Sequence, residues 1–297
     1  MPTYLGQIRD RAPDRFLDQI LARTRVDLTW RKQQTPRATL EQQAQKHTPR
    51  GFAAALRTRS ATGPAIIAEL KKASPSRGLI RPDFSAATLA PAMQTGGAAA
   101  LSVLTDEPFF QGSLSNLQAA SSGTTIPCLR KDFIVDEYQI VEARAYAADA
   151  VLLIAAALSD TELARLSTFA RAYALDVLCE VHTLEEAQRI RHLGCSLVGV
   201  NNRDLRTFDV RLETSLELAA ELPPDSLLVA ESGINNPADY ARLRAAGYRA
   251  FLIGETFMRQ PEPGHALAAW IAAANQYVAS TTVPALLMMG PGIPEPV

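Results

Sequence analysis

Residues Ala65 to Gly78 read AIIAELKKASPSRG, and this stretch decides the fold class. Ile66 to Ala68 predict a short buried strand, and the alternation continues into Glu69 and Lys71. Side chains two residues apart on a strand project to the same side, so this carboxylate and amine would emerge together at the strand end. Burying such a pair is costly without good hydrogen bonding, so a water-accessible mouth is the expected place. An isolated pair of this kind also fits a surface ion pair, and only its recurrence along the chain separates the two interpretations.

The alternation of strand and helix continues beyond this stretch. Short apolar runs predict eight strands that begin near Ile66, Ala100, Ile126, Ala150, Val177, Leu197, Leu228 and Phe251. Helices are expected at Ala86 to Met93, Ser115 to Ala120, Asp136 to Tyr146, Asp160 to Tyr173, Leu184 to His192, Glu213 to Glu221, Pro237 to Ala246 and His265 to Ala274. This order favours an α/β fold of the (β/α)8 TIM barrel type. A doubly wound sheet would carry a glycine-rich fingerprint after its first strand, where this chain has LKKASPS.

Three segments are expected along the 297-residue chain. Residues 1–60 predict a helical N-terminal extension, which lacks a core of its own and must pack its apolar stripe on the barrel. Residues 61–276 form the barrel. Residues 277–297 are rich in Pro and Gly and are expected to form a mobile tail.

Composition excludes several classes of protein. The 30 Lys and Arg nearly balance the 31 Asp and Glu, without a long basic block, which argues against a nucleic-acid partner. The chain has no apolar run long enough to span a bilayer, and MPTYLGQIRDRAPD has no apolar h-region, so we expect a soluble cytoplasmic protein without a membrane partner. Cys128, Cys179 and Cys195 lack CxxC spacing and are expected to be reduced core thiols. The histidines lack metal-ligand spacing, so no metal is expected, and GxSxG and GxxxxGK motifs are absent.

Polar side chains recur at the predicted strand ends. They are Glu69, Lys71, Lys131, Asp132, Glu180, Asn201, Asn202, Arg203, Glu231 and Ser232. Any one of them fits a cap or an ion pair. In barrel enzymes, however, catalytic groups sit at the carboxyl ends of strands, and converging unlike charges shift pKa values, so the set predicts an active site. His182 is interpreted as pointing to the opposite face of its strand from Glu180 and as structural.

A phosphate site is expected beside this set. Gly233 follows the seventh strand and Gly254 the eighth, where barrels commonly bind a phosphate with backbone N–H groups. Ser74 and Lys71 could add a hydroxyl and a positive charge. The two glycines also fit turn chemistry alone. The Phe109-Phe110 pair fits either the core or an aromatic wall of the mouth.

Together these motifs resemble the indole-3-glycerol-phosphate synthase family of tryptophan biosynthesis. The matching segments, in family order, are IIAELKKASPSRG, LSVLTDEPFFQGS, LRKDFIVDEYQI, CEVH, GVNNRDL, ESGI and FLIGETFMR, and the helical extension from Phe16 also matches. The resemblance implies a TIM barrel with extra N-terminal helices near the mouth and no cofactor. It implies a carboxy-lyase that converts 1-(2-carboxyphenylamino)-1-deoxyribulose 5-phosphate to indole-3-glycerol phosphate, CO2 and water. The partner would be this small phosphorylated substrate, with the protein a monomer or weak homo-oligomer.

The resemblance also implies roles for the catalytic residues. Lys131 would be the general acid and Glu180 an acid/base group. Glu69 and Lys71 would orient the others, with Lys71 also reaching substrate oxygens, including the phosphate. The remaining polar positions are Asn201, Glu231 and Ser232. We further expect Lys131 to titrate below a free lysine, because partial burial and a second ammonium group would disfavour its proton.

The binding residues follow in the same way. Ser74, Gly233, Gly254 and Glu255 align with the phosphate site. At Glu255 the backbone N–H would meet the phosphate, and the side chain should turn away. The anthranilate ring would lie between Phe110 and Phe133, with Arg203 near the substrate carboxylate and hydroxyls.

Two other functions remain open on the sequence. A sugar-phosphate isomerase on the same barrel would carry a catalytic Cys and Asp at strand ends in place of Lys131 and Glu180. A non-catalytic binding barrel would be expected to lack Lys131 or Glu69, which are both present.

Overall fold

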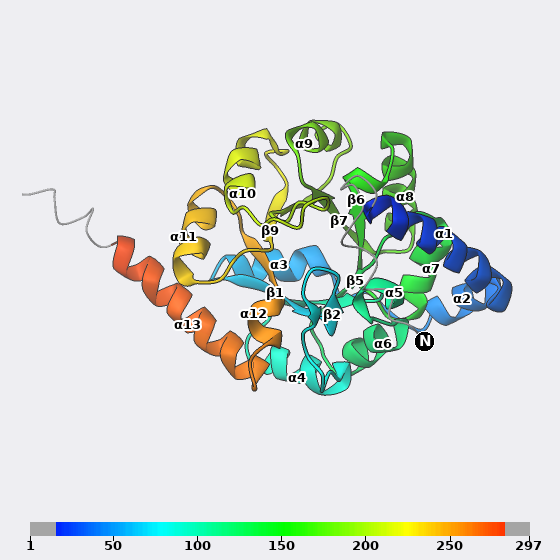
Figure 1. Cartoon of the computed structure of the whole chain (residues 1–297), viewed down its shortest axis with the longest axis horizontal. Helices are drawn as coiled ribbons and strands as arrows, with labels where there is room; N and C mark the ends of the chain where they lie inside the picture. The colour runs from blue at the N-terminus through cyan, green and yellow to red at the C-terminus, as the bar shows by residue number, and fades with distance from the viewer. Residues whose placement is uncertain (1–15, 283–297) are drawn as a thin grey trace, which may run out of the picture.

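The computed structural model describes residues 16–282. Within this range eight parallel strands close into a barrel in the order β1-β10-β9-β8-β7-β6-β5-β4. The strands are β1 (Ala65–Leu70), β4 (Ala100–Leu104), β5 (Cys128–Lys131), β6 (Ala150–Ile154), β7 (Asp176–Val181), β8 (Leu197–Asn201), β9 (Leu227–Glu231) and β10 (Ala250–Ile253). Figure 1 shows the helices arranged around these strands. The TIM barrel is confirmed, and each strand begins within two residues of its expected start.

The surrounding helices follow the strands in turn. They are α4 (Ala86–Thr95), α6 (Leu114–Ser122), α7 (Glu137–Ala145), α8 (Asp160–Ala172), α9 (Leu184–Ile190), α10 (Glu213–Leu218), α11 (Pro237–Ala245) and α13 (Pro263–Thr282), with 3-10 turns at η4 (Ala155–Ala157) and η5 (Ala219–Glu221). Several begin at side-chain caps. The Ser159 side chain, for example, accepts a hydrogen bond from Glu162 N, and the Glu162 carboxylate accepts one from Ser159 N, which together form a capping box. The caps place the helix starts where the sequence pattern expects them.

The strands read as continuous apolar runs because both of their faces are buried. In β6, Ala150 and Leu152 point into the barrel cluster, whereas Val151 and Leu153 pack against the outer helices. This arrangement follows from parallel strands with helices on one face and a filled barrel on the other. The barrel interior is therefore a packed core below the level of the site.

Three short elements that were not predicted lie over the carboxyl ends of the strands. They are the hairpin of β2 (Ala73–Ser74) and β3 (Gly78–Leu79), α5 (Glu107–Phe110) and α12 (Glu255–Met258). Asp106 caps α5 by accepting from the backbone N–H groups of Phe109 and Phe110. Each element is too short for a periodic signal, yet together they shape the mouth.

The N-terminal extension packs on the barrel. It consists of α1 (Phe16–Gln34), α2 (Arg37–Ala44) and α3 (Phe52–Ser60), and Figure 1 shows α1 and α2 beside α7. Leu28 and Leu40 share a buried cluster with Tyr138 of α7. The Tyr138 hydroxyl donates to the carbonyls of Arg31 and Thr35. The extension thus acquires its core from the outer helices, as its apolar stripe requires.

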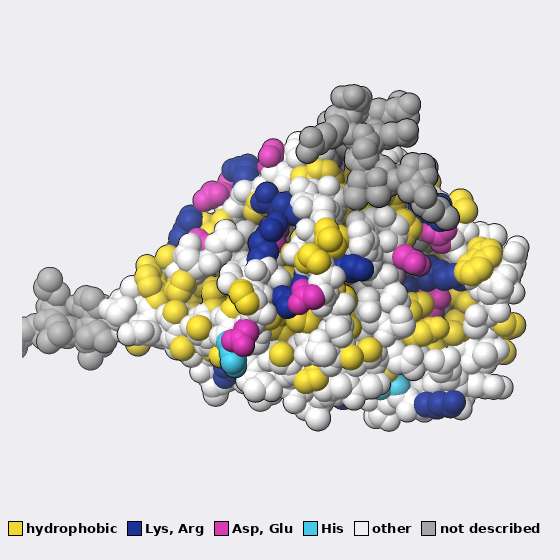
Figure 2. Space-filling view, turned by 60° about the horizontal axis from the view of Figure 1, so that its bottom comes forward, with side chains coloured by type: hydrophobic (Ala, Val, Ile, Leu, Met, Phe, Trp, Pro, Cys, Tyr) yellow, Lys and Arg dark blue, Asp and Glu magenta, His cyan; other side chains and the backbone are white. Residues whose placement is uncertain are grey.

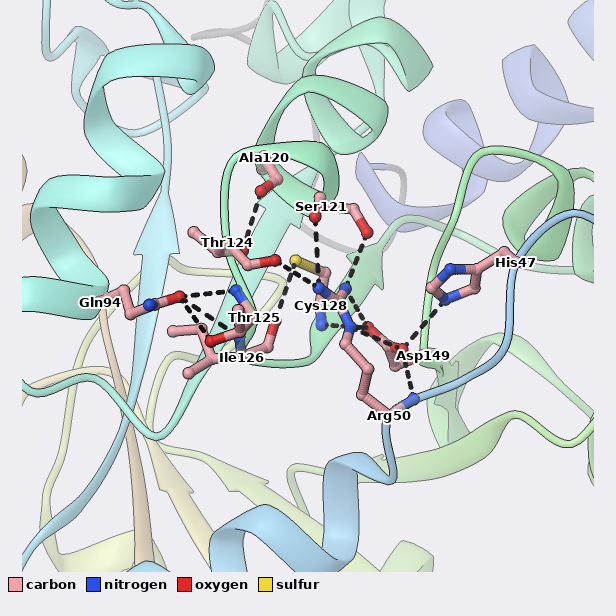
Figure 3. A network of polar contacts seen from close by, with 10 residues as sticks. All are labelled: His47, Arg50, Gln94, Ala120, Ser121, Thr124, Thr125, Ile126, Cys128 and Asp149. Atoms are coloured by element: carbon pink, nitrogen blue, oxygen red, sulfur yellow. Dashed lines mark hydrogen bonds and ion pairs between the residues drawn. The ribbon is translucent and has the colours of Figure 1, made fainter.

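A buried ionic network fixes the segment before α3 to the amino-terminal ends of β5 and β6 (Figure 3). The Arg50 guanidinium pairs with both carboxylate oxygens of Asp149 and donates to Ser121 Oγ at 2.7 Å. Asp149 also accepts from Cys128 N at 2.6 Å and lies 3.1 Å from His47 Nε2. Burial opposes ionisation of Asp149, but these donors lower its pKa. The extension is therefore anchored at the barrel face opposite the site.

The C-terminal helix is longer than expected. It runs from Pro263 to Thr282, so the first residues of the expected tail are helical, because AANQYVAST continues the Ala-rich pattern. Residues 283–297 of that tail, like residues 1–15 of the extension, lie outside the described residues.

The surface and the thiols of residues 16–282 have the following character. Figure 2 shows basic, acidic and hydrophobic side chains interspersed on one face. No helix between residues 16 and 282 has the length and apolar character needed to cross a bilayer. Cys128, Cys179 and Cys195 are buried free thiols.

Candidate active site

A cavity of about 460 Å³ opens at the carboxyl ends of the barrel strands. The residues given catalytic or binding roles from the sequence line it: Glu69, Lys71, Ser74, Phe110, Lys131, Phe133, Glu180, Asn201, Arg203, Glu231, Ser232, Gly233, Gly254 and Glu255. Asn202, which belonged to the same strand-end set, is not among the residues that line it. They converge because the strand ends of a closed parallel barrel meet around one opening. The ammonium groups of Lys71 and Lys131 therefore share a single site.

Lys131 lies at the centre of the polar cluster. Its Nζ donates to Glu180 Oε2 at 2.5 Å and to Glu231 Oε2 at 3.1 Å. Burial lowers the pKa of this ammonium, but the carboxylates of Glu180, Glu231 and the more distant Glu69 raise it well above the ordinary lysine value. The expectation that Lys131 titrates below a free lysine was therefore wrong for this structure. Two carboxylates lie within hydrogen-bonding distance of the Lys131 ammonium, which the sequence pattern did not indicate.

The pKa values of the two carboxyl groups around Lys131 are shifted in opposite directions. Although burial opposes ionisation of Glu180, Lys131 and His182 lower its pKa. Burial raises the pKa of Glu231 to about 8, and the neighbouring Glu180 carboxylate adds to this rise. Two acid groups whose pKa values are pushed apart can serve as base and acid at the same pH. The shared environment therefore favours the ionised form of Glu180 and disfavours that of Glu231.

His182 belongs to this cluster, contrary to the sequence interpretation. Its Nε2 lies 3.2 Å from Glu180 Oε1, and its Nδ1 lies 3.3 Å from Glu186 Oε2. Residues 180 and 182 are two apart at the end of β7, so their side chains share a face. The sequence interpretation, which placed them on opposite faces, was therefore wrong. Burial lowers the pKa of His182, but the two carboxylates raise it to about 9. His182 is thus a cation that holds Glu180 from the side opposite Lys131.

Replacing His182 with Gln should change the pH dependence of stability. A histidine whose folded-state pKa lies above its ordinary value of 6.5 stabilises the fold fully below that pH, and the contribution is lost as pH rises through about 9. Thermal melts from about pH 6 to about pH 10 should show a Tm difference from the parent that is largest at the acid end. His265→Gln is the matched control, because His265 is exposed and pairs with Glu262 at the surface. A Tm difference that grows towards pH 10 would contradict this electrostatic role.

The Glu69 and Lys71 pair lies across the cavity from β7. Lys71 Nζ donates to Glu69 Oε1 at 2.5 Å, and both side chains are largely buried. The bond directs the ammonium into the cavity instead of into bulk water. The pair is therefore part of the mouth and not an isolated surface ion pair.

Polar backbone and hydroxyl groups gather at one end of the cavity. Ser232 and Gly233 both have positive φ, of 65° and 76°, so the chain turns sharply after β9. A serine in this conformation is strained, which is frequent at functional sites. Ser232 Oγ donates to Asn201 Oδ1 at 2.9 Å, while the buried Ser74 Oγ lacks a protein partner within the described residues. This end offers unfilled hydrogen-bonding capacity to a ligand.

Two arginines that the sequence reasoning did not select border the same end. Arg259 pairs with Glu255 Oε1 at 2.9 Å, and Arg77 from the β2–β3 hairpin lies 3.4 Å from the same oxygen. The Glu255 side chain is thus held by two arginines at this end of the cavity. Arg77 stands in the segment AIIAELKKASPSRG, but its contact with Glu255 was not predicted, because the hairpin brings it to α12 from a distant part of the chain.

Aromatic side chains line the other end. The rings of Phe110 and Phe133 have centroids 6.3 Å apart. Phe16 of α1 packs edge-on against Phe109 and Phe208, with centroids 5.8 and 5.0 Å apart. The sequence reasoning missed Phe16 and Phe208, because these residues meet only when the extension folds over the mouth.

Two strand-end residues serve the fold more than the cavity. Asp132 accepts from the buried Arg130 guanidinium and from Thr105 Oγ1. Asn202 accepts from Ser215 and donates to the Ser232 carbonyl, which fixes the turn after β9. The strand-end rule therefore selected neighbours of the site together with the site itself.

Among residues 16–282, no group of three His, Cys, Asp or Glu side chains is arranged to hold a metal ion. The cavity instead combines ammonium groups, carboxylates, an aromatic wall and a polar end. Fold and site together define a (β/α)8-barrel enzyme of acid–base type.

Comparisons with known proteins specify the family. The profile of indole-3-glycerol phosphate synthase matches residues 17–269. Indole-3-glycerol phosphate synthase of Koribacter versatilis is 57% identical over 84% of this chain and 96% of the relative. The Burkholderia vietnamiensis protein of the same name is 49% identical over 85% of this chain and 97% of its own length. This chain belongs to the indole-3-glycerol phosphate synthase family, whose members are lyases of tryptophan biosynthesis.

Similar solved structures agree on the fold. Thiamine phosphate pyrophosphorylase from Pyrococcus furiosus superposes with a TM-score of 0.54 at 15% identity, covering 73% of this chain and 98% of the other. A 3-hexulose-6-phosphate synthase superposes with a TM-score of 0.56 at 17% identity, covering 70% and 99%. At such identities the likeness shows the barrel alone.

Proposed function

We propose that this enzyme converts 1-(2-carboxyphenylamino)-1-deoxyribulose 5-phosphate to indole-3-glycerol phosphate, CO2 and water, with Lys131 as the general acid and Glu180 as an acid/base group. The observation that carries the proposal is the Lys131 ammonium, held by two carboxylates with different proton affinities inside a cavity that has one aromatic and one polar end. The family membership reported above supports the same reaction.

The substrate would lie along the cavity between these ends. Its phosphate would accept from Ser74 Oγ and from backbone N–H groups at Gly233, Gly254 and Glu255, with Lys71 as a countercharge. The anthranilate ring would pack between Phe110 and Phe133. Arg203 would meet the substrate carboxylate or hydroxyls, since its guanidinium lines the cavity while donating to the Phe208 carbonyl. The ketone would then lie near Lys131.

Ring closure requires an acid at the ketone oxygen. The ring carbon that bears the carboxylate attacks the ketone carbon, with electrons supplied through the aniline nitrogen, and aromaticity is lost. The Lys131 ammonium hydrogen-bonds the oxygen and transfers a proton as the carbon–oxygen double bond becomes a single bond. The developing alkoxide is a stronger base than the lysine amine, so even an ammonium with a raised pKa can donate. Preorganised positive charge in a water-poor site stabilises this transition state.

Decarboxylation and dehydration complete the indole. The bond to the carboxylate breaks, CO2 leaves, and its electron pair restores the benzene ring. The new hydroxyl then leaves as water after protonation by an ammonium group, Lys71 or Lys131, while Glu180 takes a proton from the methylene carbon next to nitrogen. Two protons are donated and one is recovered, so each turnover takes up one proton from solvent. The remaining polar groups, Glu69, Asn201, Glu231 and Ser232, would orient these participants.

A direct assay tests the proposal. Purified protein and the carboxyphenylamino ribulose phosphate should give indole absorbance and fluorescence together with an equal amount of CO2. An isomerised but still carboxylated product would instead support the sugar-phosphate isomerase alternative. That alternative has little structural support, because Cys128, Cys179 and Cys195 are all buried away from the residues that line the cavity. Binding without turnover would favour the non-catalytic barrel.

A further inference from the structure

Strand β8 carries a glycine at an inward-facing position just below the site. Gly199 lies between Leu197, which belongs to the barrel-interior cluster, and Asn201, which lines the cavity. In the sheet it pairs with Glu180 of β7 on one side and with Val229 of β9 on the other. Gly199 therefore occupies the wall between the strands that carry Glu180 and Glu231.

The Glu231 carboxylate fills the space that a side chain at position 199 would need. A Cβ atom built on Gly199 would lie 2.2 Å from Glu231 Oε1, far inside van der Waals contact. Glu231 Oε1 is itself buried without a hydrogen-bond partner in the described part of the chain, while Oε2 accepts from Lys131. The carboxylate thus lies against bare backbone on one side and against the ammonium on the other.

We infer that Gly199 is a positioning residue for the proposed reaction: its missing side chain gives Glu231 the space from which the carboxylate reaches Lys131. The inference rests on the proposed function and adds to it a residue that touches neither substrate nor reacting atoms. Its influence passes through Glu231 to the lysine. With any larger residue at 199, the carboxylate must move away from its present position.

The surroundings of Gly199 allow the carboxylate to move while the barrel stays intact. The next nearest atoms to the added Cβ are Glu231 Cδ and Leu178 Cδ1, both at 3.3 Å, so the only severe overlap is with the far end of a flexible side chain. Gly254 differs in this respect. A Cβ there would lie 2.7 Å from Glu69 Oε1 and also 2.9 Å from Glu69 Cβ, which is fixed to the backbone of β1. Position 199 is therefore the cleaner place to separate positioning from folding.

A double-mutant cycle tests the inference. Gly199→Ala should lower kcat on the order of 10²-fold, as expected for a displacement of about 1 Å in a catalytic cluster, with a much smaller change in KM. In a Glu231→Ala background the same substitution should change kcat little, because the displaced group is gone. Gly123→Ala is the matched control, since a Cβ at this helix end meets nothing closer than 3.3 Å and the parent kcat should be kept. An unchanged kcat in Gly199→Ala, or an equal loss in both backgrounds, overturns the inference.

Thermal stability provides a second readout that does not depend on catalysis. If Gly199→Ala lowers Tm or prevents folding, adding Glu231→Ala should restore much of the loss, because the overlapping oxygen is removed. Equal destabilisation with and without Glu231 would show that the glycine serves packing alone and would overturn the inference. If the parent protein fails to make indole product, the proposed function fails, whereas the coupling in Tm still reports on Gly199 and Glu231.

Discussion

Lys131→Met is expected to lower kcat by about 10² to 10⁴, the usual contribution of a positioned acid–base group. Met retains much of the length and apolar stem of lysine but cannot donate to the ketone oxygen. The substrate's phosphate and ring contacts lie elsewhere in the cavity, so substrate binding should persist. Steady-state kinetics followed by indole fluorescence, with binding measured by calorimetry, would separate the two quantities.

The same substitution should also destabilise the protein, because it leaves Glu180 and Glu231 buried without their shared cation. Activity must therefore be compared at a temperature where the variant is folded. Lys46→Met is the matched control, since Lys46 is exposed on the segment after α2, away from the residues that line the cavity. A folded Lys131→Met protein with near-parental kcat would refute the role of Lys131.

Glu180→Gln is expected to reduce kcat by a similar factor, about 10² to 10⁴. Glutamine keeps the shape of the side chain but can neither accept the methylene proton nor hold Lys131 and His182 by charge. The rate of CO2 release and the rate of indole formation should be measured separately in quenched-reaction samples, because ring closure and dehydration depend on different groups. We expect the loss to be greatest in the steps after CO2 leaves.

The pH dependence of stability should change in the same variant. Glu180 has a pKa below its ordinary value of 4.5, so its contribution to stability is present above that pH and is lost as pH falls through the lower folded-state value. The stability of Glu180→Gln should therefore fall less than that of the parent protein as the pH is lowered into the acid range. Glu185→Gln, at an exposed position on α9, is the matched control for both measurements. Full dehydration activity in Glu180→Gln would exclude it as the base.

Much of the barrel could be predicted because its strands are buried on both faces. Runs such as AVLLI at β6 are apolar throughout, and the amphipathic helices between them follow the 3.6-residue period. The site followed from a geometric rule, since a closed parallel barrel brings all carboxyl strand ends to one opening. Glu69 and Glu231 could therefore be placed together although they are far apart in sequence.

Other features depend on distances that no sequence pattern fixes. The proton affinity of Lys131 depends on how closely two carboxylates approach it, and the sequence reasoning had the direction wrong. His182 could have been found, because the two-residue period already places it beside Glu180. The contributions of Phe16 and Arg77 could not, since these residues reach the mouth through the extension and the β2–β3 hairpin. A cytoplasmic location, a monomer or weak homo-oligomer and the lack of a nucleic-acid partner stay predictions.

The proposed mechanism depends most on Lys131 being a protonated lysine held between Glu180 and Glu231. The most direct measurement is an NMR titration of ¹³C-lysine-labelled protein, with the Cε resonance of Lys131 assigned by comparison with Lys131→Arg. We predict that Lys131 stays protonated beyond pH 10.5, the ordinary lysine value, and that Glu180→Gln moves its titration to lower pH. A Lys131 that loses its proton below pH 10.5 in the folded parent protein, with no change in Glu180→Gln, would contradict the account.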